Sequence, residues 1–111
     1  MDGVLTDAGM YYTEEGDEIK KFCTYDGMGF KLLQKRGVKV GILTSEDRDL
    51  NRRRAKKLGL DIDLHGAKDK LNIVIELCND KKIELDEVAY IGDDVNCFEL
   101  LSNVGIAACP N

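Results

Sequence analysis

Short apolar runs alternate with longer amphipathic stretches along most of this chain, and that alternation restricts its fold more than any other feature. Apolar runs at 38–43, 62–64, 88–91 and 104–108 are expected to be strands, and the segments between them have the apolar spacing of helices. Strands that alternate with helices of about ten residues are typical of a parallel sheet with helices on both faces. The sequence therefore predicts an α/β fold.

Local signals give the ends of the helices. Helices are predicted between a cap at Asp26 and a stop at Gly37, from 47 or 49 to 58, from 69 onward and at about 96–102. Asp26 is expected to cap the first, whose apolar positions are Met28, Phe30, Leu32 and Leu33. Asp69 is expected to cap the third, with its apolar face formed by Leu71, Val74, Ile75 and Cys78. Gly59 is expected to end the second.

A β-hairpin is predicted near the N-terminus. Residues 10–14 and 18–23 have strand-like composition and flank 15–17, where Gly16 can form a turn. Tyr11, Tyr12 and Phe22 are interpreted as packing groups. Two strands are too few to be stable alone in water, so one face of this hairpin needs burial and its edges need pairing.

Composition excludes several classes of function. A chain of 111 residues, 43% hydrophobic and 33% charged, fits one small domain over 1–111. It has no apolar run of the roughly 20 residues that a membrane span requires, and no signal-like N-terminus. We therefore expect a cytoplasmic protein without a membrane partner. The net charge of −5 argues against nucleic acid as a partner.

The cysteines indicate neither a zinc site nor a redox motif. None of the four (Cys23, Cys78, Cys97 and Cys109) belongs to a C-x-x-C pair. Cys78 and Cys109 lie in apolar patterns and are expected in the core.

Two adjacent carboxylates, Asp93 and Asp94, directly follow the strand predicted at 88–91. Neighbouring carboxylates repel, so a protein that holds them together usually neutralises them with a cation, and hard oxygen ligands suit Mg²⁺. A solvated acidic turn is the alternative interpretation.

Three other polar residues lie at or near the carboxyl ends of predicted strands: Asp2, Thr44 and Lys70. Because loops at the carboxyl ends of parallel strands converge, these residues and Asp93 are predicted to form one site. Thr44 could instead cap a helix, and Lys70 could be a solvated surface lysine.

Five phrases occur in a fixed order: Asp-Gly-Val-Leu-Thr-Asp at 2–7, Lys-Lys-Phe at 20–22, Gly-Ile-Leu-Thr at 41–44, Asp-Lys-Leu at 69–71 and Val-Ala-Tyr-Ile-Gly-Asp-Asp at 88–94. Together they resemble the haloacid-dehalogenase superfamily of phosphatases. The similar branch contains the 3-deoxy-D-manno-octulosonate 8-phosphate phosphatases, sialic-acid-type 9-phosphate phosphatases and the phosphatase-like domain of acylneuraminate cytidylyltransferases. The resemblance covers essentially the whole chain. It implies a Rossmann-like fold with a hairpin inserted after the first motif and no large cap domain.

The resemblance also implies a Mg²⁺-dependent phosphatase of a sugar-acid phosphate that works through an aspartyl-phosphate. Asp2 matches the aspartate that protonates the leaving group, and it is also predicted to lie beside the metal. Thr44 matches the phosphoryl-binding hydroxyl, and Lys70 the cation that offsets phosphoryl charge. Asp93 matches the metal ligand, with Asp94 as a second or alternative ligand. Many members have a further Asp at the position of Cys97, so a weaker metal site, or one that depends on Asp94, is expected.

The family's nucleophilic aspartate corresponds to the position before Met1. The N-terminal strand and the glycine-rich C-terminal tail of the family are likewise expected outside 1–111. Little or no phosphatase activity is therefore expected from the 111 residues alone.

The expected substrate-binding residues are Thr44, Ser45, Glu46, Arg54, Lys57 and Lys70. Ser45-Glu46 with Lys57 resembles relatives that act on nine-carbon phosphates, whereas octulosonate phosphatases typically have Gly-Arg or Gly-Lys after the threonine. A guanidinium can bind a sugar-acid carboxylate, although the basic run at 52–57 could be a solvated helix face. His65 is interpreted as a structural or loop residue rather than a catalytic base.

Two functions remain open from the sequence: a sugar-acid phosphatase and a non-catalytic, phosphatase-like oligomerisation domain. In the resembled family the hairpins of four subunits pack together. A homotetramer through the hairpin at 10–23 is therefore expected, and Tyr12→Asp and Phe22→Asp are expected to split it.

Overall fold

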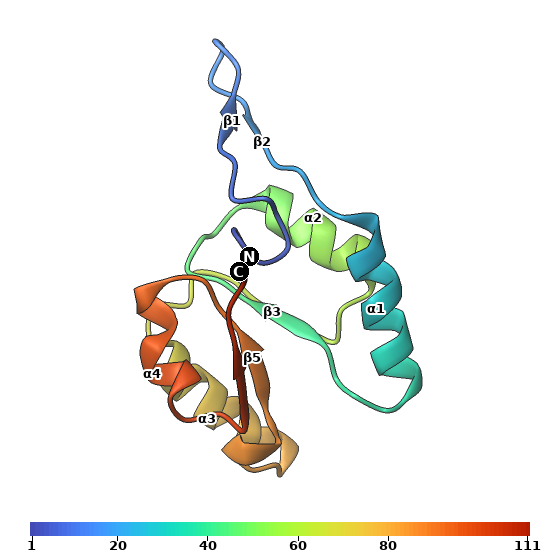
Figure 1. The fold of residues 1–111 in the computed structure, drawn as a ribbon, viewed down its shortest axis with the longest axis vertical. Coiled ribbons are helices and arrows are strands. Elements are labelled where there is room, and N and C mark those ends of the chain that lie inside the picture. Colours follow the sequence, from blue (N-terminus) through green and yellow to red (C-terminus); the bar gives the residue numbers. More distant parts are fainter. The chain divides into compact units, whose positions relative to one another are not determined.

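The computed structural model describes residues 1–111, which form two compact units, Met1–Gly66 and Ala67–Asn111. The elements of the first unit are β1 (Tyr11–Tyr12), β2 (Glu18–Ile19), α1 (Thr24–Lys35), β3 (Gly41–Leu43), α2 (Asp49–Leu58) and β4 (Ile62–Leu64). Those of the second are α3 (Lys70–Lys81), the 3-10 turn η1 (Leu85–Glu87), β5 (Ala89–Ile91), the 3-10 turn η2 (Val95–Cys97), α4 (Phe98–Leu101) and β6 (Ile106–Ala108) (Figure 1). The predicted alternation of strands and helices is confirmed.

In the first unit, β3 and β4 form a parallel pair with α2 between them in the chain. The buried apolar side chains of this unit come from β3, the residue directly before it, and α2: Val40, Ile42, Ala55 and Leu58. The last two lie on one face of α2, as expected for helical spacing. Gly59 ends α2 in the left-handed region, with φ 64°, where glycine avoids the Cβ clash.

The strand predicted at 38–43 is shorter than expected and begins only at Gly41. Two backbone donors before Gly41 are satisfied outside the ladder, whereas Val40 O accepts from Ile62 N at 3.3 Å. Val38 N donates to Leu33 O at 3.1 Å, and Val40 N donates to Asp61 Oδ2 at 2.9 Å. These backbone donors are satisfied by a helix end and a side chain instead of a neighbouring strand.

The predicted N-cap of the first helix is wrong by three residues. The helix α1 begins at Thr24 with Cys23 as its N-cap, so Asp26 lies in the first turn rather than at the cap. Met28, Leu32 and Leu33 are exposed. An apolar face of α1 is therefore open to solvent.

The predicted hairpin is confirmed. Tyr11 lies opposite Ile19 in an antiparallel pair, and Gly16 has the positive φ (92°) that its turn requires. Figure 1 shows the hairpin extending away from the helices of its own unit. Tyr12 is 60% exposed and Ile19 54%. At the hairpin base, the ring of Phe22 lies 5.1 Å beneath the Arg54 guanidinium, which is a packing role.

In the second unit, β5 and β6 form a parallel pair, and α3 and α4 lie to one side of it (Figure 1). Its core is formed by Ala67, Val74, Cys78, Cys97 and Leu100. The Asp69 cap is confirmed, because its Oδ1 accepts from Asn72 N at 3.3 Å.

Two expectations for this unit need correction. The helix predicted at 96–102 is the 3-10 turn η2 followed by the short α4. Cys78 is buried as predicted, but Cys109 is exposed beyond β6. An apolar pattern near the end of the chain therefore does not place Cys109 in the core.

The α/β class is confirmed, with parallel strand pairs, a hairpin after the first motif and no large cap. None of the helices is both long enough and apolar enough to span a bilayer.

Candidate functional site

A buried lysine forms the centre of a polar cluster in the first unit. The side chain of Lys20, directly after β2, is 1% exposed. Its Nζ donates to both carboxylate oxygens of Asp2, at 2.8 and 3.0 Å, and to Glu46 Oε2 at 2.5 Å. A third carboxylate, Glu18, lies 3.7 Å away. Two predicted site residues, Asp2 and Glu46, are therefore bridged by one ammonium.

This cluster shifts the pKa values of Lys20 and Glu46. Burial alone would lower the pKa of Lys20, but hydrogen bonds to Asp2 and Glu46 outweigh it and raise that pKa. Burial would raise the pKa of Glu46, but hydrogen bonds with Lys20, Asp2 and Asn51 lower it overall. Asn51 is fully buried and donates to Glu46 Oε2 at 3.2 Å. Glu46 is therefore an ionised carboxylate held from two sides.

Lys20 and Asn51 were not among the predicted site residues. The phrase Lys-Lys-Phe at 20–22 marked the segment without giving a role to its first lysine. Nothing in the local pattern distinguishes Lys20, which is buried, from Lys21, which is exposed.

Thr44 lies directly after β3 and is buried. Its backbone N donates to Leu64 O at 3.0 Å, and its Oγ1 accepts from Glu46 N at 3.3 Å. The hydroxyl therefore stabilises the turn that contains Ser45, which is exposed. The alternative of a helix cap is wrong, because the N-cap of α2 is Arg48.

The basic residues of α2 differ in their surroundings. Arg54 Nη2 donates to Cys23 O at 2.9 Å and covers Phe22, so this guanidinium connects α2 to the start of α1. Lys57 is exposed. Substrate binding by Arg54 and Lys57 stays a prediction.

His65 follows β4 with its side chain 3% exposed. Its Nδ1 lies 2.5 Å from Asp63 Oδ1, and its Nε2 is buried without a hydrogen-bond partner. These surroundings agree with the interpretation of a structural histidine.

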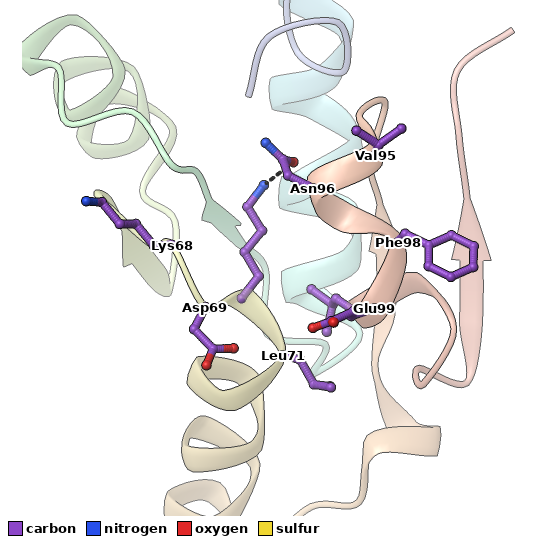
Figure 2. A pocket seen from close by; sticks show the side chains of 9 residues that line it. Lys68, Asp69, Leu71, Val95, Asn96, Phe98 and Glu99 are labelled. Carbon is purple, nitrogen blue, oxygen red and sulfur yellow. Dashed lines mark hydrogen bonds between the residues drawn. The ribbon is translucent and has the colours of Figure 1, made fainter.

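In the second unit, Lys70 is the first residue of α3 and is buried. Its Nζ donates to Asn96 Oδ1 at 3.3 Å, the bond dashed in Figure 2, and to Cys97 Sγ at 3.2 Å. The alternative of a solvated surface lysine is therefore wrong. Both Lys70 and Asn96 line an open pocket of about 320 Å³, together with Lys68, Asp69, Leu71, Val95, Phe98, Glu99 and Leu100.

Asp93 and Asp94 directly follow β5 and are exposed. Neither carboxylate forms an ion pair or accepts a side-chain hydrogen bond, so their oxygens suit a hard cation such as Mg²⁺. Within neither unit do three or more Asp, Glu, His or Cys form a cluster that could hold a metal. The three-carboxylate metal site that also includes Asp2 stays a prediction.

Cys97 is buried among polar groups. Besides Lys70, its Sγ contacts Asn96 Oδ1 at 3.3 Å and the Tyr90 hydroxyl at 3.4 Å. Burial, followed by the contact with Cys97, raises the pKa of Tyr90. Tyr90 therefore remains a neutral phenol at physiological pH.

Residues 28–105 match the model of the haloacid dehalogenase-like hydrolases. The chain belongs to this family. It is 35% identical over 94 residues to the 3-deoxy-D-manno-octulosonate 8-phosphate phosphatase KdsC of Haemophilus influenzae, a match that covers 85% of this chain and 52% of that protein. The chain thus spans about half the length of this curated relative.

Two solved structures of the family are also similar. A Moraxella catarrhalis 3-deoxy-D-manno-octulosonate 8-phosphate phosphatase in complex with magnesium, phosphate and KDO superposes with TM-score 0.92 at 36% identity, over 99% of this chain and 64% of that one. The cobalt-bound Haemophilus influenzae enzyme superposes with TM-score 0.88 at 31% identity, over 97% and 63% of the two chains.

Proposed function

We propose that this chain supplies the core of a Mg²⁺-dependent phosphatase that acts on a sugar-acid phosphate through an aspartyl-phosphate. The observation that supports it most is the likeness to the Moraxella catarrhalis phosphatase, whose structure contains magnesium, phosphate and KDO. Thr44 is buried after β3, and Lys70 is buried at the start of α3. Both residue types are usually exposed in proteins, so their burial here agrees with a functional role.

Each site residue has a proposed role. Asp2 protonates the leaving alkoxide, and Lys20 holds its carboxylate in place. Thr44 binds a phosphoryl oxygen, and the Lys70 ammonium offsets phosphoryl charge. Asp93 and Asp94, with Asp2, would hold Mg²⁺, which when bound supplies further positive charge at the phosphoryl group.

Two substrates are candidates: 3-deoxy-D-manno-octulosonate 8-phosphate and a nine-carbon sialic-acid-type 9-phosphate. Named relatives of the chain act on the first. Ser45, Glu46 and Lys57 favour the second by resemblance. The two candidates are distinguished by measuring the hydrolysis of both esters by the unaltered sequence and by its Glu46→Gln and Lys57→Met variants.

The activity test compares two proteins: the 111 residues, and the same residues preceded by an apolar strand ending in Asp. We expect Mg²⁺-dependent phosphate release from the extended protein and a loss of several decades in rate without the nucleophile. Failure of the extended, folded protein to hydrolyse either ester contradicts the proposal.

Metal binding is tested by calorimetric titration of the 111-residue chain with Mg²⁺. Asp93→Asn is expected to abolish the heat of binding. Asp80→Asn changes an exposed carboxylate at the end of α3 and is the matched control, so it should leave binding intact. Equal Mg²⁺ binding by both variants would show that Asp93 is not a metal ligand.

A non-catalytic oligomerisation domain is the second candidate, favoured by the exposed hairpin residues Tyr12 and Ile19. Activity of the extended protein would contradict it. An inactive extended protein that still assembled would support it.

A further inference from the structure

The amine of Lys70 and the thiol of Cys97 lie in direct contact inside the second unit. Their Nζ and Sγ atoms are 3.2 Å apart, and the two residues are only 8% and 3% exposed. Asn96 Oδ1 accepts from both atoms, at 3.3 Å each, which holds the amine and the thiol against each other. Burial restricts both side chains, so the contact persists rather than forming occasionally.

This thiol differs from the other cysteines of the chain. Cys23 and Cys109 are exposed, and Cys78 is buried without a hydrogen bond to its thiol. Only Cys97 has an amine nitrogen within hydrogen-bonding distance of its sulfur. The three other cysteines therefore serve as internal controls for any chemistry that needs the lysine.

The pocket borders two residues that contact the Cys97 thiol, and Cys97 itself does not line it. Lys70 and Asn96 both line the open hollow of about 320 Å³ (Figure 2). Figure 2 shows that Asn96, whose amide oxygen contacts both reactive atoms, faces this space. A hydrogen peroxide molecule is about the size of two waters and fits there.

We propose that Lys70 and Cys97 form a reversible sulfur–nitrogen cross-link when the protein meets hydrogen peroxide. The sulfur attacks one peroxide oxygen, the O–O bond breaks, and water leaves, which oxidises the thiol to a sulfenic acid. The lysine ammonium gives one proton to solvent, and its nitrogen lone pair attacks Sγ. The S–O bond then breaks, and its hydroxyl leaves as water with a second nitrogen proton.

The net change is the loss of two hydrogens from the protein and the reduction of one peroxide to two waters. A thiol reductant reverses it by attacking Sγ and releasing the amine. The cross-link replaces an ammonium by a neutral nitrogen. If the proposed function holds, on which this consequence rests, peroxide switches off the phosphatase by removing the charge of Lys70.

The test treats the purified 111-residue chain with a small excess of hydrogen peroxide and maps it by proteolysis and mass spectrometry. We expect one joined pair of peptides containing Lys70 and Cys97, lighter by two hydrogens than their sum. We also expect trypsin to stop cleaving after Lys70, with both effects reversed by dithiothreitol. Unjoined peptides, with Cys97 either reduced or oxidised to an acid, overturn the proposal.

Matched variants separate the chemistry from nonspecific oxidation. Lys70→Arg keeps a positive charge but should lose the cross-link, whereas Lys68→Arg changes a nearby exposed lysine and should keep it. Cys97→Ser should lose it, and Cys78→Ser should keep it. Circular dichroism checks that each variant is folded, and the unaltered chain alone suffices for the decisive measurement.

Failure of this proposal can be distinguished from failure of the proposed function. The cross-link is read by mass and needs no turnover. A cross-linked chain whose extended form has no phosphatase activity would refute only the function. An active extended form without a cross-link would refute only the redox switch.

Discussion

Lys20 places one buried ammonium among three carboxylates, Asp2, Glu18 and Glu46. Such an arrangement is stable only while the cation is present, because desolvated carboxylates repel each other at short range. The side chains of Asp2 and Glu46 are 32% and 34% exposed, so water screens part of this repulsion.

We therefore expect Lys20→Met to lower the free energy of unfolding by about 3 kcal/mol, near the lower end for loss of one partner from a buried ion pair. Urea unfolding followed by circular dichroism measures this. The matched control is Lys21→Met, because Lys21 is exposed and forms a single long ion pair, 3.9 Å from Asp7. Its effect should stay within about 0.5 kcal/mol. Equal effects of both substitutions would mean that the cluster adds no stability.

Glu46 gives the protein a pH-dependent stability. Its pKa in the folded chain lies below the ordinary value of 4.5. The contribution of the Glu46 carboxylate to the free energy of unfolding is therefore complete above pH 4.5 and is lost as pH falls through the folded pKa. Glu46→Gln removes this contribution. The stability difference between the unaltered chain and Glu46→Gln should therefore be largest near neutrality and shrink below pH 4.5.

Urea unfolding at several pH values between neutrality and acid measures that difference. Asp49→Asn is the control, because its carboxylate is 87% exposed. A Glu46→Gln difference that stays constant with pH would contradict the expected role of Glu46.

At the scale of elements, α1 contains two glycines in different surroundings. A Cβ at Gly29 would meet nothing within 4 Å, whereas one at Gly27 would lie 2.9 Å from Leu58 Cδ2. Gly29→Ala should stabilise the chain by about 0.5–1 kcal/mol, because alanine loses less backbone entropy in a helix. Gly27→Ala should gain less or destabilise, since Leu58 is buried and must move.

Thermal unfolding of the two variants tests this comparison, and each serves as the control for the other. A Gly27→Ala variant at least as stable as Gly29→Ala would show that Leu58 adapts without loss.

Elements whose signals are local were predicted well from the sequence. Strand β4 has the predicted bounds, Asp69 caps α3, and Gly59 ends α2. In each case the deciding residue lies within or directly beside the element. Thr44 lies beside the predicted strand end and Lys70 at the predicted helix start, and both residues are buried there.

Features that depend on distant partners were not predicted. Lys20 binds carboxylates 18 and 26 residues away, so no local pattern separates it from Lys21. Directly before β3, Val40 N bonds to the side chain of Asp61, which is 21 residues away in the chain. The exposure of Cys109 was not predicted, because an apolar pattern alone does not determine which face of a strand the rest of the chain covers.

At the scale of the whole molecule, the exposed hairpin surface leads to a prediction about assembly. Tyr12 and Ile19 on the hairpin, with Met28 and Leu32 on α1, are large exposed apolar residues. Two such strands need further burial to be stable, and the family resemblance implies four subunits, so we expect a homotetramer through the hairpin. Phe22, which lies under Arg54, is a less suitable probe of that interface than Ile19.

Tyr12→Asp combined with Ile19→Asp should reduce the tetramer to smaller species, because each subunit would bury two uncompensated carboxylates in the interface. Size-exclusion chromatography with light scattering measures the mass. Tyr25→Asp is the control, as Tyr25 is an 84% exposed tyrosine outside the hairpin. If the unaltered protein is a monomer, or if the double change leaves the tetramer intact, the hairpin is not the interface between subunits.

The two parallel strand pairs also have a consequence for the speed of folding. Strands β3 and β4 are separated in the chain by α2, and strands β5 and β6 by η2 and α4. Each pairing therefore requires closure of only one short crossover, and the entropy lost on closure grows slowly with its length. Refolding within each unit should be fast for an α/β chain, whereas any association through the hairpin becomes slower on dilution.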